Sequence, residues 1–257
     1  MTRFCHGAAT STGRVRKVNE DSYLALPRLY AVADGMGGHG AGDVASALAI
    51  DILITCTRLG ALSVDTVLAA LGEANRAILA RDEADSMGTT ITGLACLDSA
   101  GGNSHLMVFN VGDSRVYRLA DDRLDQVTVD HSEVNELVLA GALTREQART
   151  HPRRNIVTRA LGSDPVVLPD HWLLPAVAGD RYLLCSDGLF SELPDESILE
   201  LVSVGGPEQS ATALVAAANA AGGRDNITVV VVDVDVDHDA AADDTTTPRD
   251  QLASGHD

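Results

Sequence analysis

Four separated aspartates, each next to a glycine or an asparagine, constrain this 257-residue chain more than any other feature. Three follow an apolar run typical of a buried strand, and the fourth precedes one. They occur as Asp34-Gly35, Gly112-Asp113, Asp187-Gly188 and Asp225-Asn226. A carboxylate at a strand end is held by a rigid scaffold and still reaches solvent, while the neighbouring glycine lets the backbone approach a ligand. We therefore expect all four in turns at sheet edges.

Carboxylates that converge repel one another unless a cation lies among them. The pattern therefore predicts a site for a hard divalent ion, Mg²⁺ or Mn²⁺, which prefers oxygen ligands. The alternative is four unrelated turns, since Asp-Gly pairs are common in turns. Four such pairs at strand ends, with further motifs beside them, favour the metal site.

Composition narrows the class of protein. The chain is 45% hydrophobic, enough for one large domain or two small ones. Its 19 basic and 37 acidic residues give a net charge of −18. That charge disfavours a nucleic-acid surface, which needs a basic stripe. The four cysteines have no CxxC spacing and are interpreted as reduced core residues. Neither a signal peptide nor a membrane-spanning run is evident. We expect a cytoplasmic monomer that contacts neither nucleic acid nor membrane.

Hydrophobic periodicity predicts strands at both ends of the chain with helices inserted between them. Predicted strands cover residues 4–9, 21–26, 28–33, 89–98, 104–111, 114–119, 123–129, 171–175, 181–186 and 227–234. Predicted helices cover 41–58, 64–84, a hairpin of short helices at 132–150, 195–203 and 207–221. Short turns between consecutive strands favour antiparallel sheets with helices on their outer faces, an α+β class. Residues 1–234 form the predicted domain, and the Asp-rich segment 235–257 is predicted to be a disordered tail.

One motif points to a rival class. Residues Gly35 to Gly40 read GxGxxG after a strand and before a helix, as in a dinucleotide-binding turn. Asp34 immediately before the first glycine would repel a pyrophosphate. If Asp51 were the ribose partner, too few residues would remain after Gly40 for the intervening helix. A nicotinamide or flavin enzyme is therefore disfavoured.

Seven short motifs follow one another along residues 5–234. They are Gly13 to Asp21 (GRVRKVNED), Asp34 to Gly40, Met87 to Thr90, Gly112 to Arg115, Asp130 to Ser132, Ser186 to Leu189 and Arg224 to Thr228. In this order and spacing the chain resembles the metal-dependent protein phosphatase family (PPM, type 2C), in its bacterial form. The resemblance implies a four-layer α-β-β-α sandwich, two antiparallel sheets flanked by helices, with metals at one end.

The resemblance also implies an activity: hydrolysis of phosphoserine and phosphothreonine by direct attack of a water activated by two metal ions, Mn²⁺ or Mg²⁺. Such an enzyme reverses protein kinase signalling. Its expected partners are phosphorylated proteins and a cognate serine/threonine kinase. By the same resemblance Asp34 bridges the two ions, the Gly35 carbonyl completes one, and Asp187 and Asp225 hold the other.

Three further acids have weaker assignments. By resemblance, Glu20 supports the second ion directly or through water, and Asp21 orients waters around the ions. The alternative for both is a charged strand start. Asp113 carries a third, weaker ion in the bacterial form, and the alternative is an ordinary turn aspartate.

Two residues are predicted to act on the substrate. Arg16 lies three residues before Asn19, as in the family's Arg-x-x-Asn-Glu-Asp, and its guanidinium can hold two phosphate oxygens. The alternative is an exposed basic stretch shared with Arg14 and Lys17. His39 is a candidate general acid, although a structural histidine at a helix start is the alternative, and Met36 occupies the place where some relatives carry a histidine.

Other phosphatase chemistries do not fit. No cysteine is followed six residues later by the arginine that a thiolate phosphatase needs, and the one lysine, Lys17, is not in a Walker loop. A catalytically dead relative would be expected to lack a metal-binding aspartate. Residues 131–162, the flap, resemble the family's variable segment beside the active site. Its Arg153 and Arg154 either meet an acidic phosphosite or balance nearby acids.

Overall fold

The computed structural model of this chain describes residues 2–37, 41–58, 61–81, 87–97 and 105–236. His39 and the predicted tail from residue 237 onward lie outside the described residues. The described part contains two β-sheets, and every strand pairing in them is antiparallel.

The first sheet is five-stranded, in the order β1-β11-β10-β7-β8. Its strands are β1 (Thr2–Ser11), β7 (Arg115–Ala120), β8 (Arg123–Gln126), β10 (Arg181–Cys185) and β11 (Ile227–Val236). Strand β11 is almost continuously valine, as expected for a central strand buried on both faces. It pairs with β1 along ten residues, from Thr2 opposite Val236 to Ser11 opposite Ile227.

The second sheet has the order β2-β3-β5-β6-β9, and β4 pairs with the far end of β3. Its strands are β2 (Asp21–Leu26), β3 (Leu29–Gly37), β4 (Met87–Thr89), β5 (Ile91–Leu97), β6 (His105–Val111) and β9 (Asp170–Pro175).

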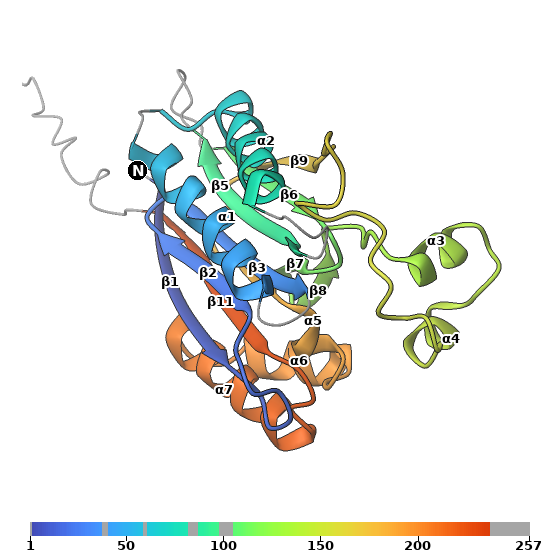
Figure 1. Cartoon of the computed structure of the whole chain (residues 1–257). Helices are drawn as coiled ribbons and strands as arrows, with labels where there is room; N and C mark the ends of the chain where they lie inside the picture. Colours follow the sequence, from blue (N-terminus) through green and yellow to red (C-terminus); the bar gives the residue numbers. More distant parts are fainter. Residues whose placement is uncertain (1, 38–40, 59–60, 82–86, 98–104, 237–257) are drawn as a thin grey trace, which may run out of the picture.

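Three apolar layers hold the sandwich together. One lies between the two sheets and includes Tyr30, Val108, Tyr182 and Val232, all fully buried. The second packs α1 (Ala41–Arg58) and α2 (Val64–Arg81) on the second sheet. The third packs α5 (Asp187–Phe190), α6 (Asp195–Val202) and α7 (Pro207–Ala221) on the first sheet. Figure 1 shows this α-β-β-α order, which confirms the predicted fold class.

The flap contains two short helices, α3 (Glu133–Leu139) and α4 (Arg145–Arg149). The hairpin of helices predicted at 132–150 is therefore confirmed, with its break at Gly141 in the left-handed region (φ 73°). Figure 1 shows that this pair of helices projects away from the sandwich. Among the described residues, no helix combines the length and apolar character needed to cross a membrane.

Several element boundaries differ from the predictions. Asp34-Gly35 is not a turn but lies inside β3, because residues Gly35 to Gly37 pair with β4. The strand predicted at 89–98 is two strands separated at Thr90. Asp187 does not lie in a turn but is the first residue of the short helix α5. Its negative charge is favourable there, at the positive end of the helix dipole. Strand β8 ends at Gln126, and β11 runs to Val236, two residues past the predicted domain limit.

Gly93 illustrates how tightly the second sheet packs. It lies opposite Phe109 in the pairing of β5 with β6, and a Cβ on Gly93 would come within 2.0 Å of the Phe109 ring. The ring is fully buried, so it has no free space to enter. Only glycine fits at this position.

We therefore expect Gly93→Ala to lower the free energy of unfolding by about 1–3 kcal/mol, the usual cost of overpacking a core. Gly72→Ala is the matched control, because its Cβ would meet nothing closer than the Arg76 side chain at 3.5 Å on the surface of α2. This helical substitution should stabilise the chain by roughly 0.5–1 kcal/mol. Urea unfolding measures both; equal stability of the two variants would contradict the packing.

Candidate metal centre

Asp21 and Asp34 are brought together by the pairing of β2 with β3, where they are direct partners. Residues opposite each other in an antiparallel pair direct their side chains to the same face. Thr89, the last residue of β4, and Thr90, which separates β4 from β5, bind the backbone of Asp34. Its N–H donates to Thr90 Oγ1 (3.1 Å), and its carbonyl accepts from Thr90 N–H (2.9 Å) and Thr89 Oγ1 (2.9 Å).

Glu20 is fixed through its backbone. Its N–H donates to Asn226 Oδ1 (2.9 Å), and its carbonyl accepts from Gly35 N–H (3.1 Å) and Ser46 Oγ (2.6 Å). Gly35 must be a glycine here, because a Cβ would come within 2.2 Å of the Gly42 carbonyl oxygen at the start of α1. The loop before β2 is therefore tied to β3, α1 and the start of β11.

Asn226 organises the same loop from the first sheet. Its side-chain amide donates to the carbonyls of Thr12 (3.0 Å) and Val18 (2.9 Å) while its Oδ1 accepts from Glu20. The side chain is almost fully buried, so all three bonds are shielded from water. Asn226 lies in the last of the seven sequence motifs but was not among the predicted site residues. The signal that could have identified it is an amide beside Asp225 at the start of a buried strand.

Ser186 joins the two sheets at Asp21. Its Oγ donates to Asp21 Oδ2 (2.8 Å) and accepts from Thr228 N–H (2.9 Å). The next residue, Asp187, begins α5, and Gly188 packs so closely that a Cβ would lie 2.0 Å from the Asn226 carbonyl oxygen. This contact holds Asp187 beside the Asp225 loop.

Asp225 and Arg16 form an ion pair, with Arg16 Nη2 2.7 Å from Asp225 Oδ2. The other oxygen, Asp225 Oδ1, accepts from Asn226 N–H (2.8 Å). The Arg16 side chain is 51% exposed, against 29% for Asp225, so the guanidinium lies at the solvent side of the carboxylates. The hydrogen bond from Arg16 to Asp225 raises the pKa of Arg16 further. Arg16 is exposed, as are Arg14 and Lys17, and its ion pair with Asp225 sets it beside the carboxylates.

Asp113 lies in the predicted turn after β6 and is almost fully buried. Gly112 adopts φ 113°, and a Cβ there would come within 2.5 Å of Thr90 Cβ. Ser114 Oγ lies 2.8 Å from Thr90 Oγ1, so the turn is tied to the same threonine that holds Asp34. Thr90 lies in the third sequence motif but was not among the predicted site residues.

The five aspartates Asp21, Asp34, Asp113, Asp187 and Asp225 therefore form one group, named here the acidic cluster. Burial raises the pKa of Asp34 well above its ordinary value, and the charges of the other four raise it further. Burial is also the main reason that the pKa of Asp21 rises to about 7, that of Asp113 to about 8 and that of Asp187 to about 6. The charge of Asp225 raises the pKa of Asp187 further, whereas Arg16 and Arg115 lower it.

The acidic cluster fits a hard cation by its donor chemistry. Its side-chain donors are all carboxylate oxygens, and Asp21 Oδ1 is buried without a hydrogen-bond partner. In the part of the chain that the structure describes, no three His, Cys, Asp or Glu side chains already form a closed set of ligands.

His131 anchors the flap beside the acidic cluster. Its Nδ1 accepts from Gly112 N–H (3.1 Å), so the ring proton is on Nε2, which donates to Asp170 Oδ2 (3.1 Å). Arg159 Nη1 donates to the other oxygen of Asp170 (3.1 Å). His131 at the start of the flap and Arg159 near its end thus bind the same carboxylate, that of Asp170. His131 also binds Gly112, the residue before Asp113.

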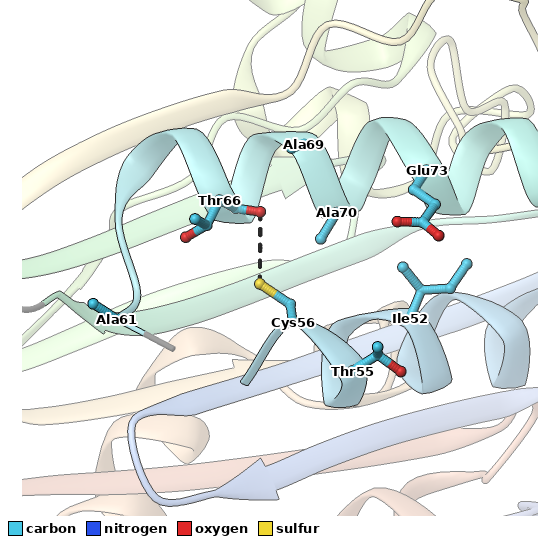
Figure 2. Close-up of a pocket in the computed structure, with 8 residues that line it drawn as sticks. All are labelled: Ile52, Thr55, Cys56, Ala61, Thr66, Ala69, Ala70 and Glu73. Atoms are coloured by element: carbon cyan, nitrogen blue, oxygen red, sulfur yellow. Dashed lines mark hydrogen bonds between the residues drawn. The ribbon is translucent and has the colours of Figure 1, made fainter. Parts of the chain in front are cut away.

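A separate pocket of about 180 Å³ lies between α1 and α2. Figure 2 shows its mostly apolar lining, with Cys56 Sγ donating to the Thr66 carbonyl (3.6 Å). Cys56 is ten residues beyond Ser46 on α1, which is about 15 Å along a helix. The pocket is therefore distant from Ser46, which binds the carbonyl of Glu20 next to Asp21.

The raised pKa values predict how stability depends on pH when divalent ions are chelated. Between the ordinary carboxyl pKa of 3.8 and the raised values, the folded chain binds more protons than the unfolded chain. The free energy of unfolding should therefore fall as pH rises from about 5 to about 8. Asp113→Asn removes one of these groups and should flatten the slope, whereas Asp125→Asn, on the exposed face of β8, should not.

Urea unfolding in EDTA at several pH values measures this slope. A wild-type chain that becomes more stable toward pH 8 would contradict the buried-carboxylate assignment. An Asp113→Asn slope identical to wild type would remove Asp113 alone from it.

Comparisons with known proteins agree with the fold. The family model described as "Protein phosphatase 2C" matches residues 11–217. PstP of Mycobacterium tuberculosis, a serine/threonine protein phosphatase, is 43% identical over 232 residues, which are 88% of this chain but 44% of PstP. This chain therefore spans less than half of that curated relative. The serine/threonine phosphatase stp of Listeria innocua is 39% identical over 238 residues, covering 86% of this chain and 92% of stp.

Two solved structures have the same architecture. The Mycobacterium tuberculosis phosphatase PstP/Ppp superposes with a TM-score of 0.84 at 41% identity, covering 91% of this chain and 99% of that one. The catalytic domain of PstP in complex with two manganese ions gives 0.83 at 41% identity, covering 92% and 100%. Because the family model matches most of the described sandwich and the relatives share its sequence and fold, this chain belongs to the protein phosphatase 2C family.

Proposed function

We propose that this chain is a metal-dependent protein-serine/threonine phosphatase that hydrolyses phosphoserine and phosphothreonine by direct attack of water. The observation that carries the proposal is the acidic cluster, in which Asp21 and Asp34 are direct strand partners and Asp21 Oδ1 is buried without a hydrogen-bond partner. Family membership and the manganese-bound relative support the same reading. The substrates are phosphorylated proteins, and the reaction reverses the action of a serine/threonine kinase.

Two ions, Mn²⁺ or Mg²⁺, would be held by Asp34 and the Gly35 carbonyl on one side and by Asp187 and Asp225 on the other. Glu20 and Asp21 would complete the set, and Asp113 would hold a third ion. Bound divalent ions lower the pKa of a water and neutralise phosphate charge.

The residues of this chain then position the substrate. Arg16 lies at the solvent side of the carboxylates, where its guanidinium can hold two phosphate oxygens and orient phosphorus for in-line attack. Water adds to phosphorus, the bond to the serine or threonine oxygen breaks, and that oxygen takes a proton. His39 is the proposed donor. The competing function, a binding module without turnover, would require that this same set of acids be inactive.

Removing one carboxylate separates catalysis from folding. Asp187→Asn should lower turnover of a phosphothreonine peptide by at least about 100-fold and weaken Mn²⁺ binding, because a ligand charge is lost. In EDTA the variant should be as stable as wild type or more stable, because one repelling charge is gone. Phosphate release, calorimetric Mn²⁺ titration and urea unfolding measure the three effects. Asp125→Asn is the exposed control.

Wild-type turnover should vanish in EDTA and return with Mn²⁺ or Mg²⁺. Full activity in chelator would reject the metal-dependent mechanism. Tight Mn²⁺ binding without turnover on any phosphopeptide would favour the binding module instead.

Arg16→Ala distinguishes substrate positioning from support of Asp225. Loss of a bidentate, charge-assisted contact costs roughly 1.5–3 kcal/mol, so kcat/KM should fall about 10- to 150-fold with KM raised. Arg16→Lys keeps the charge but not the two-pronged geometry and should recover only part of the loss. If Mn²⁺ affinity fell while KM stayed constant, Arg16 would instead belong to the scaffold of Asp225.

A further inference from the structure

The flap differs in charge from the rest of the molecule. Between Glu133 and Arg159 it has five arginines and three glutamates, so it is positive in a chain whose net charge is −18. All five arginines are exposed. A local charge opposite to that of the whole chain indicates a surface that meets an anionic partner.

Both ends of the flap begin next to the acidic cluster. At its entry, His131 N–H donates to the Gly112 carbonyl (2.9 Å), one residue before Asp113. At its exit, Leu161 and Thr89 exchange backbone hydrogen bonds of 2.9 and 3.0 Å beside the strand that holds Asp34. Helices α3 and α4 project from these roots, as Figure 1 shows. A polypeptide with its phosphate at the cluster therefore has the flap beside it.

Three of the five arginines already have partners. Arg153 Nη1 lies 2.5 Å from Glu133 Oε1, and Arg159 is bound to Asp170. Arg149 donates to the Leu193 carbonyl (3.4 Å) and lies 3.9 Å from Asp195. These pairs fix the flap to itself and to the sandwich, and they neutralise three of its five positive charges. The charged side chains of the flap that form no ion pair among the described residues are Arg145, Arg154, Glu136 and Glu146. For Arg153 the structure favours the balancing role over phosphosite recognition.

Arg145 and Arg154 have no ion pair and no side-chain hydrogen bond to any residue within the described ranges. They lie at the start of α4 and just after it, on either side of the paired Arg149 and Arg153. Both guanidinium groups are solvated and available. Leu139, in helix α3 of the flap, is 72% exposed and gives the flap an apolar contact point.

We propose that Arg145 and Arg154 form a docking surface for acidic residues that flank the phosphorylated serine or threonine. The substrates of this chain are then phosphosites within acidic segments. The inference rests on the proposed function, because it takes the acidic cluster as the place where the phosphate binds. Exposed ion pairs each change an equilibrium constant roughly 1.4- to 5-fold, so two of them give a preference of about 2- to 25-fold. The preference weakens as salt screens the charges.

The test compares two phosphothreonine peptides. In one, the phosphothreonine is flanked by Asp and Glu, and in the other the same positions are Asn and Gln. Wild-type chain with Mn²⁺ should give a kcat/KM ratio that favours the acidic peptide, more strongly at low salt. The double variant R145E/R154E should lose or reverse that ratio while p-nitrophenyl phosphate, which has no flanks, is hydrolysed as before. R58E/R123E is the matched control, since it changes the net charge equally at exposed sites outside the flap.

An unchanged ratio in R145E/R154E would overturn the proposal, as would an equal loss in the control, which would indicate a general effect of net charge. Fluorescence anisotropy of the two labelled peptides in EDTA measures the affinity of the chain for each peptide in the absence of turnover. If wild type hydrolysed no phosphopeptide, the proposed function would fail, while the anisotropy ratio would still decide whether the flap selects acidic segments. Equal binding of both peptides there would reject the docking surface independently.

Discussion

The fold of this chain has to accommodate five aspartates whose charges repel one another at one end of a β-sandwich. In water, such carboxylates would separate. Here the register of β2 with β3 and the packing of two loops hold them together, and burial raises the pKa values of four of them. The cluster is stable only with protons or cations among the carboxylates. This requirement connects the architecture to the chemistry of the site.

Uncharged groups hold the cluster in place. Asn226, Ser186 and Thr90 each make several hydrogen bonds to the backbone or side chains of the loops that carry the aspartates. Because these partners do not titrate near neutral pH, the bonds that they make to backbone groups do not depend on the charge of the carboxylates. The scaffold can thus keep its geometry while the charge of the site changes. Glycines at 35 and 188 permit the backbone approaches that this arrangement needs.

The sequence predicted most elements because apolar periodicity is a local signal. Helix α1 matches its predicted range, and the α3–α4 hairpin breaks at Gly141 as expected. The errors occurred where a distant partner decided the conformation. The Asp34-Gly35 pair resembles a turn locally, but β4, some fifty residues later, pairs with Gly35 and extends the strand. Thr90 then leaves the strand because its backbone and hydroxyl bind Asp34 instead.

For the site itself, the sequence by itself determined the chemistry of the donors: oxygen ligands on aspartates, arranged in the order typical of one family. The apolar periodicity by itself supported an α+β class, and the order of the layers was implied by the family resemblance. Only the tertiary structure decided which acids meet, that Arg16 pairs with Asp225, and that Glu133 neutralises Arg153 but leaves Arg154 free. These contacts join residues up to 209 positions apart. They depend on strand register and loop packing, which no local pattern encodes.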